Sequence, residues 1–255
     1  VIFCHADAHI IHHEGGAVEF MTGGAKLVPV SGSVEGKMDP ASLEKAMARF
    51  PDGDVHVGQK MALSITQATE AGTIHSLDEI RALSTIASNA GLKVHMDGAR
   101  FSNAIAALGC TPAEMTWKSG IDILSLGGTK NGCWCAEAIV FFDTDLAADM
   151  PHLRKRGANL FSKSTFVSAQ FDEWLKDDLW LTLARHSNAM AQTLADAVKA
   201  SRASRLAWEA GGNQLFIILN DDTARRMADA GVPLRTRETP DSLQGTLKND
   251  EKIYR

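Results

Sequence analysis

Short apolar runs alternate with helical patterns along about the first 145 residues, and this alternation restricts the fold more than any other feature of the chain. Such an alternation is typical of an α/β domain in which helices flank a mixed, mostly parallel sheet. The apolar runs that we interpret as strands are Val1–Cys4, Lys26–Val30, Lys60–Ile65, Lys93–Met96, Ile121–Leu126 and Ala136–Phe142.

Capping signals mark the helices between these strands. Asp39-Pro40 provides an N-cap followed by a proline in the first turn. Ser76–Glu79 and Thr111–Glu114 have the spacing of capping boxes, in which two side chains satisfy free backbone amides at the helix start. Gly91 and Gly109 are placed where glycine commonly ends a helix. These signals predict one helix after each N-cap.

The pattern changes after Asp143. A long helical region from about 164 to 200 precedes a predicted strand, Gln214–Leu219, and a short helix, Asp222–Ala230. We predict a large cofactor-binding domain over residues 1–163 and, over residues 164–255, a long connecting helix with a partial small C-terminal α/β domain. The segment 233–255 is polar and weakly periodic, and we expect no complete domain edge there.

Charge and composition argue against several kinds of partner. The chain has 26 Lys and Arg against 31 Asp and Glu, a net charge of −5, without the clustered basic charge typical of nucleic-acid binding. No apolar run approaches the roughly 20 residues that span a bilayer, and the start at Val1 lacks the pattern of a signal peptide. The four cysteines match neither a disulfide scaffold nor a zinc knuckle, so we expect reduced thiols in the cytoplasm.

A carboxylate and an arginine follow one of the predicted core strands. Asp97, Gly98 and Arg100 come directly after the strand that ends near Met96. Open α/β sheets bind ligands at the carboxyl ends of their strands, so we expect Asp97 to face a ligand. The alternative is that Asp97 only caps the following helix.

A lysine among glycines follows the next strand. Lys130 lies in the run Gly127–Gly132, where we expect small neighbours to let a flat ligand approach the backbone. Burial or nearby cations would lower the pKa of Lys130 and free its amine as a nucleophile toward a carbonyl. The spacing is not that of a P-loop. The alternative is an ordinary loop lysine.

Histidines and carboxylates gather near the N-terminus. Both are ligands of transition metals, so a metal site, and with it a metal-dependent hydrolase, is one interpretation. Because the H-E-x-x-H spacing is absent, we predict no metal and favour an imidazole stacked on a flat aromatic ligand. The residues of this cluster are His5, Asp7, His9, His12, His13 and Glu14.

Taken together, these three signals match what pyridoxal phosphate requires of a protein. The cofactor needs a lysine for a Schiff base and a carboxylate for its pyridine nitrogen. A charge-assisted bond of the second kind contributes about 1.5–3 kcal/mol. Asp97 and Lys130 each follow a core strand, so we expect them to meet in one crevice.

Longer motifs extend over roughly residues 1–220, and their combination is more specific than any single one. They are Cys4–Ile10, Glu14–Gly16, Thr22–Lys26, Ser64–Thr73, His95–Arg100, Trp117-Lys118, Gly128–Gly132 and Asp177–Leu181. With these motifs the chain resembles the low-specificity L-threonine aldolases, in the fold type I (aspartate-aminotransferase-like) group of pyridoxal-phosphate enzymes.

The resemblance implies a role for each candidate. Lys130 would bind the cofactor covalently, Asp97 would pair with its ring nitrogen, and His9 would stack on the ring. Arg100 would bind the carboxylate of the substrate. His9, or a water molecule that it orients, would act as the base, since imidazole titrates near neutral pH.

Two further assignments are less direct. Lys163 is our candidate for the cofactor phosphate, with Arg154–Arg156 behind it. Some relatives carry a histidine where this chain has Glu70, and the role of Glu70 is left open.

The implied reaction is that of a carbon–carbon lyase. L-Threonine, L-allo-threonine and related β-hydroxy-α-amino acids would be cleaved between Cα and Cβ to glycine and an aldehyde. The resemblance also implies a homo-oligomer, a tetramer or dimer, with sites near the subunit interfaces. A related β-eliminating amino-acid lyase is the alternative within the same chemistry.

The two ends of the chain differ from the family pattern. Relatives begin before Val1, with a Gly-Thr-rich turn that holds the cofactor phosphate at a helix N-terminus. They also end with a strand that brings a second arginine to the substrate, which the segment from Pro233 does not resemble. An inactive or truncated aldolase homologue is therefore a further interpretation.

Overall fold

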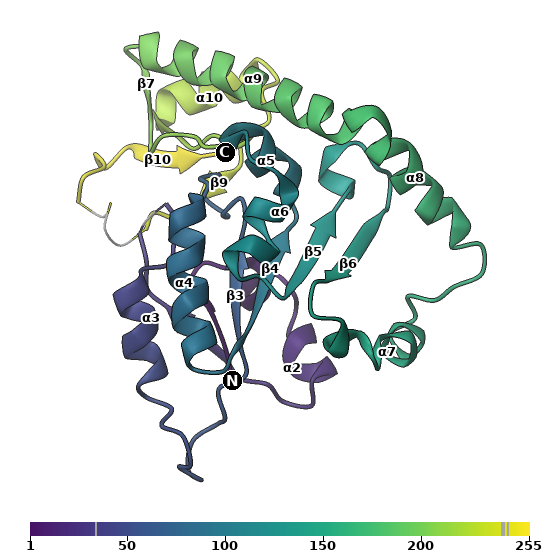
Figure 1. Ribbon diagram of the computed structural model, residues 1–255. Coiled ribbons are helices and arrows are strands. Elements are labelled where there is room, and N and C mark those ends of the chain that lie inside the picture. Colours follow the sequence, from purple (N-terminus) through teal and green to yellow (C-terminus); the bar gives the residue numbers. More distant parts are fainter. Residues whose placement is uncertain (34, 241–242, 244) are drawn as a thin grey trace.

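The chain, as a computed structural model, is described over residues 1–33, 35–240, 243 and 245–255. A six-stranded sheet with the order β2-β1-β3-β4-β5-β6 forms its centre (Figure 1). Neighbouring strands are parallel except β6, which pairs antiparallel with β5. The predicted mixed, mostly parallel α/β sheet is thus confirmed. Its strands are β1 (Ile2–His5), β2 (Leu27–Val30), β3 (Ala62–Thr66), β4 (Lys93–Gly98), β5 (Ile123–Gly127) and β6 (Glu137–Phe141).

Helices cover one face of this sheet, and three of them, α3, α4 and α6, begin where a capping signal predicts. The Asp39 carboxylate accepts a hydrogen bond from the Ser42 amide at 2.8 Å. Ser76 and Thr111 each form a complete capping box with the glutamate three residues later. The helices on this face are α3 (Pro40–Met47), α4 (Leu77–Asn89), α5 (Phe101–Leu108) and α6 (Pro112–Met115), with the turn η1 (Trp117–Ser119) after them.

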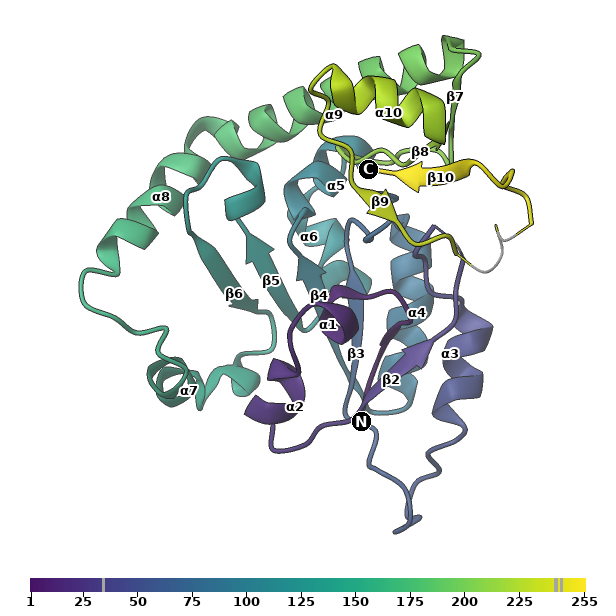
Figure 2. The same ribbon diagram turned by 180° about the vertical axis from the view of Figure 1, so that it is seen from behind.

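The two faces of the sheet carry different side chains. On the covered face, Leu63, Val94 and Met96 are almost fully buried and belong to one core with the helices. On the opposite face, which we call the open face, short helices α1 (His9–His12) and α2 (Ala17–Met21) follow β1, while no described helix lies over β5 and β6 (Figure 2). Ile139 of β6, which pairs with Ser125 on that face, is 54% exposed.

The predicted long helix is two helices. α8 (Thr165–Leu175) and α9 (Leu179–Ala200) are separated by η4 (Lys176–Asp178). Asp177 and Asp178 have φ angles of 50° and 55° there, which interrupt the helix and which aspartate tolerates better than most residues. α9 packs on α5, where Asn103 donates to Ser187 Oγ at 2.9 Å. Before α8 come η3 (Thr144–Ala147) and α7 (Met150–Arg156).

A second, four-stranded sheet has the order β7-β8-β10-β9. Its strands are β7 (Ser204–Leu206), β8 (Ile217–Asn220), β9 (Thr236–Arg237) and β10 (Glu251–Tyr254), and α10 (Asp221–Asp229) follows β8. The polar segment after Pro233 nevertheless contributes a strand to this sheet, since β10 pairs with β8 and fully buries Ile253. That this part of the chain lacks a complete domain edge stays a prediction. The apolar part of β10 is too short to show a period in the sequence. Residues 241, 242 and 244 of this segment lie outside the described residues.

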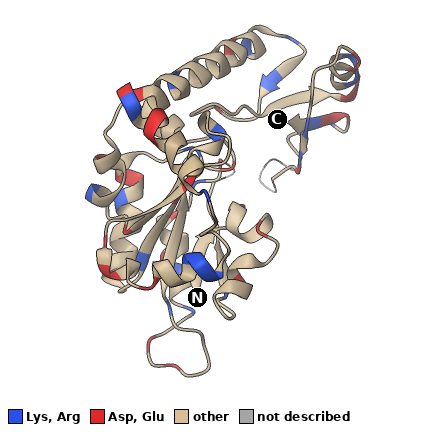
Figure 3. Cartoon of the chain, turned by 90° about the vertical axis from the view of Figure 1, so that its right-hand side faces the viewer, with Lys and Arg blue, Asp and Glu red and all other residues tan. Residues whose placement is uncertain are grey.

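Basic and acidic residues are interspersed along the chain (Figure 3). No described helix combines the length and the hydrophobicity that crossing a bilayer requires.

Candidate active site

Asp97 lies at the carboxyl end of β4, between the ends of β3 and β5. The register pairs it with Thr66 on one side and with Ser125 on the other. Asp97 Oδ1 accepts a hydrogen bond from the Ala99 amide at 3.0 Å. Helix α5 begins without any side-chain cap, so the alternative that Asp97 caps this helix is wrong. The carboxylate stands partly exposed at the edge of the sheet.

His95 links three strands below Asp97. Its Nδ1 lies 2.9 Å from Ser64 Oγ, and its Nε2 lies 2.9 Å from Ser125 Oγ. Burial lowers the pKa of His95, although the nearby Asp97 carboxylate opposes this effect. With both ring nitrogens hydrogen-bonded, His95 supports the strand that carries Asp97. This role of His95 was not predicted from the sequence, although residues two apart in a strand share one face.

Lys130 lies in η2 (Thr129–Asn131), directly after β5. Neighbours hold the turn on both sides: the Asn131 side chain donates to the Trp180 carbonyl at 2.8 Å, and Trp174 Nε1 donates to the Asn131 carbonyl at 2.8 Å. The Lys130 side chain itself is exposed. Of the two conditions named for Lys130, burial or nearby cations, burial is absent in this chain, because the neighbouring residues anchor the main chain of the turn and leave its side chain outside.

The glycines near these two residues serve the protein's own packing. A Cβ on Gly98 would lie 2.7 Å from the Ser125 carbonyl oxygen, and one on Gly127 would lie 2.9 Å from Ala99 Cα. We expected the glycines around Lys130 to admit a flat ligand. At Gly127 this is wrong, because the backbone that follows β4 fills the space.

His9 begins α1 after the end of β1. Its amide donates to Glu70 Oε1 at 2.7 Å, and its ring Nδ1 lies 2.7 Å from Glu14 Oε1. The rings of His9 and His13 have centroids 5.0 Å apart. Within the described part of the chain, no three His, Cys, Asp or Glu side chains come together as a metal site would require.

Two arginines approach this region from different parts of the chain. Arg100 Nε is buried and has no partner among the described residues, and burial lowers the pKa of its guanidinium. Arg237 of β9 donates to the Glu70 carbonyl at 3.2 Å and lies 3.6 Å from the Asp7 carboxylate. Its guanidinium carbon is 4.9 Å from the centre of the Phe216 ring. Arg237 was not predicted from the sequence, because the polar segment around it shows no local pattern.

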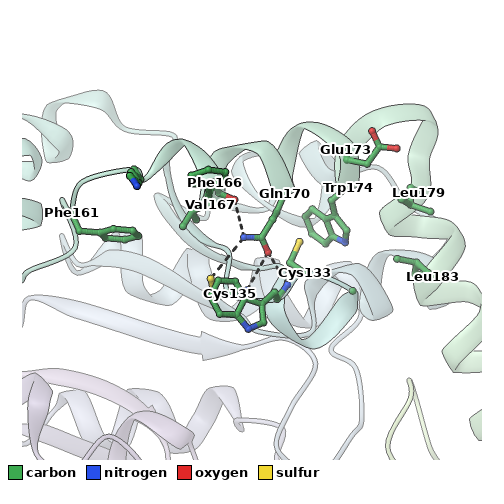
Figure 4. A pocket seen from close by; sticks show the side chains of 13 residues that line it. Cys133, Cys135, Phe161, Phe166, Val167, Gln170, Glu173, Trp174, Leu179 and Leu183 are labelled. Carbon is green, nitrogen blue, oxygen red and sulfur yellow. Dashed lines mark hydrogen bonds between the residues drawn. The ribbon is translucent and has the colours of Figure 1, made fainter.

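Lys163 lines a cavity of about 780 Å³ beside the Lys130 turn (Figure 4). Gly132, Cys133 and residues of α8 and α9 form its other walls. None of Asp97, His9 and Arg100 lines this cavity. Arg154–Arg156, at the end of α7, are exposed. Lys163 and Asp97 therefore do not line this cavity together.

The mostly parallel sheet of this order, with Asp97 and Lys130 at the ends of adjacent strands, is that of the fold type I class of α/β proteins. A family model described as "Beta-eliminating lyase" matches residues 1–220, and the chain belongs to this family.

Similar proteins carry more specific names. The chain is 42% identical over 230 residues to a low specificity L-threonine aldolase of Pseudomonas sp. (strain NCIMB 10558) and 40% identical to one of Pseudomonas aeruginosa. These matches cover 90% of this chain, which spans 66% of the length of each relative. The solved structure of Leishmania major threonine aldolase superposes with a TM-score of 0.88 at 28% identity, covering all of this chain and 70% of that one.

Proposed function

We propose that this chain carries the site of a pyridoxal-phosphate-dependent aldolase, which cleaves L-threonine, L-allo-threonine and related β-hydroxy-α-amino acids to glycine and an aldehyde. The observation that supports it most directly is the position of Asp97 at the carboxyl end of β4 and of Lys130 directly after the paired strand β5. The relatives at 40–42% identity, named low specificity L-threonine aldolases, support the choice of substrate.

The residues present fit this cofactor. Within the described part of the chain, no carboxylate pairs with the Lys130 amine, which is exposed at the strand end. Asp97 keeps a partly exposed carboxylate whose only hydrogen bond among described residues is local. The buried Nε of Arg100 has no partner, as expected of a group that binds an anion.

Each residue then has one task. Lys130 would hold the aldehyde carbon of the cofactor, and Asp97 would keep a proton on its ring nitrogen. Arg100 would bind the substrate carboxylate and thereby fix which bond at Cα faces the ring. His9, or a water molecule that it orients, would take the proton of the β-hydroxyl group. The bound cofactor supplies a ring that accepts the electron pair of the broken Cα–Cβ bond.

Other parts of the proposal concern the assembly. We retain the division into a cofactor-binding domain, residues 1–163, and a C-terminal part, residues 164–255.

Exposed Trp134 and Ile139 near the site support a homo-oligomer, a dimer or tetramer, with Lys163 near the cofactor phosphate at an interface. The free thiols of all four cysteines support a cytoplasmic location.

Borohydride reduction with added pyridoxal phosphate tests the central assignment. We expect a visible absorption band that borohydride removes, with the label mapped to Lys130 by mass spectrometry. Lys130→Ala should abolish the band and the label, whereas Lys163→Ala should keep the label on Lys130 and weaken cofactor affinity about tenfold. A band that persists in Lys130→Ala contradicts the assignment of this lysine.

The family model favours one alternative, a β-eliminating amino-acid lyase that uses the same residues. The products distinguish the two reactions. An aldolase releases glycine and an aldehyde, whereas an eliminating lyase acting on a hydroxyamino acid releases a keto acid and ammonia.

A further inference from the structure

Helix α1 begins without a cap of its own. Its N-cap residue, Ala8, offers no side-chain acceptor, and the first amides of a helix have no partner within the helix. The His9 amide is satisfied by Glu70, whose Oε1 accepts its hydrogen bond at 2.7 Å across 61 residues of sequence. Glu70 therefore supplies, from the loop after β3, the acceptor that α1 lacks.

The turn that carries Glu70 also contacts the second sheet. Arg237 of β9 donates to the Glu70 carbonyl at 3.2 Å, and Trp208 Nε1 donates to the Ala71 carbonyl at 2.7 Å. The amide of Gln67, at the start of the same loop, donates to the Asp97 carbonyl at 2.8 Å. One turn thus connects the start of α1, the second sheet and the end of β4.

The surroundings of the Glu70 carboxyl group disfavour its ionised form. Its Oε2 is buried and has no partner among the described residues. Burial raises the pKa of Glu70, and the nearby Asp97 carboxylate raises it further. A buried polar atom without a partner destabilises the fold, so stability alone does not account for a glutamate here.

We propose that Glu70 is a positioning residue, which fixes the main chain of His9, and with it the ring, relative to Asp97 and the second sheet. The inference rests on the proposed function only in taking His9 to face the cofactor. Glu14 contacts the His9 ring from five residues away, on the exposed side. Glu14 therefore orients the ring locally, whereas Glu70 determines where the main chain of α1 begins.

Amide hydrogen exchange at His9, resolved to single residues and measured without cofactor, tests the hydrogen bond itself. In Glu70→Ala, exchange at the His9 amide should accelerate at least tenfold, because its acceptor is gone. Glu70→Gln keeps an acceptor oxygen and should stay within about threefold of the unmodified chain. Glu14→Ala, the matched control, should also stay within about threefold. Unchanged exchange in Glu70→Ala overturns the inference.

Cofactor binding tests the consequence for the site. Glu70→Ala should raise the Kd for pyridoxal phosphate, followed by visible absorbance, about tenfold, and Glu70→Gln should restore it to within threefold. Equal weakening by both variants would mean that the charge acts, not the bond to His9, and would overturn the positioning role. If Glu70→Ala does not fold, Glu70→Asp replaces it. The shorter side chain of aspartate does not reach the His9 amide, so exchange at this amide should accelerate by the same factor.

The two proposals fail differently. If the unmodified chain forms no borohydride-sensitive complex with pyridoxal phosphate, the proposed function fails, while the exchange result for His9 still decides the structural part of the inference. If the complex forms but the Glu70 variants leave exchange at His9 unchanged, only the role of Glu70 fails.

Discussion

On the covered face of the six-stranded sheet, Leu63, Val94 and Met96 are at most 1% exposed and pack in one core with the helices. On the open face, the same strands carry His95 and Asp97, which are partly exposed and joined to their surroundings by hydrogen bonds. Burial of a large apolar side chain stabilises a fold more than a side-chain hydrogen bond does, because the hydrogen bond replaces one to water. The covered face therefore contributes more to the stability of the fold than the open face does. The open face can therefore carry polar and charged side chains at little cost in stability.

Removing a core side chain from the covered face should have the largest effect on stability. Met96→Ala should lower the free energy of unfolding by about 2–5 kcal/mol, because it removes buried methylene groups and leaves a cavity. Urea unfolding followed by circular dichroism measures this. Ser125→Ala, on the open face, should cost only about 1 kcal/mol through the lost hydrogen bond to His95. If both variants lowered the free energy of unfolding by the same amount, the two faces would not differ in their contribution to stability.

A buried histidine at the start of α4 should make stability depend on pH. His75 is 2% exposed, and burial lowers its pKa to about 4. The folded chain binds a proton on the His75 ring less tightly than the unfolded chain does. The free energy of unfolding is therefore highest above pH 6.5 and falls as the pH decreases from 6.5 to about 4. The loss should reach about 3 kcal/mol. Unfolding at several pH values measures it, and His75→Phe should flatten that part of the profile; an unchanged slope in this variant would exclude His75 as the cause.

A change at Asp97, the carboxylate proposed to bind the cofactor, should affect stability least. Asp97→Asn keeps an oxygen for the Ala99 amide and should change the free energy of unfolding by no more than about 0.5 kcal/mol. It removes the charge proposed to pair with the ring nitrogen, so pyridoxal-phosphate affinity should fall at least tenfold, as absorbance titration would show. A strongly destabilised Asp97→Asn with unchanged cofactor affinity would place Asp97 among the structural residues instead.

Much of the central sheet was predictable because its signals are local. Strands of apolar residues, the N-cap at Asp39 and the boxes at Ser76 and Thr111 each depend on residues within a few positions of one another, and the structure confirms them. The interruption at Asp177 was not predictable, since the apolar spacing of α8 continues into α9 and only the backbone conformation separates them.

The candidate site was predictable only in part. Asp97 and Lys130 follow strands that the sequence marks, and the parallel register brings those strand ends together. His95 and Glu70 act through partners that periodicity does not identify. Arg237 lies in a segment without a pattern, and its contact with Glu70 joins residues 167 positions apart.

The sequence by itself determined which segments form the strands and helices of the main sheet, because capping and side-chain periodicity act over a few residues. Only the tertiary structure decided that a glutamate after β3 caps α1, that an arginine of β9 reaches the same turn, and that Lys130 stays exposed. Those outcomes depend on which distant surfaces pack together, and neighbours in sequence carry no information about that.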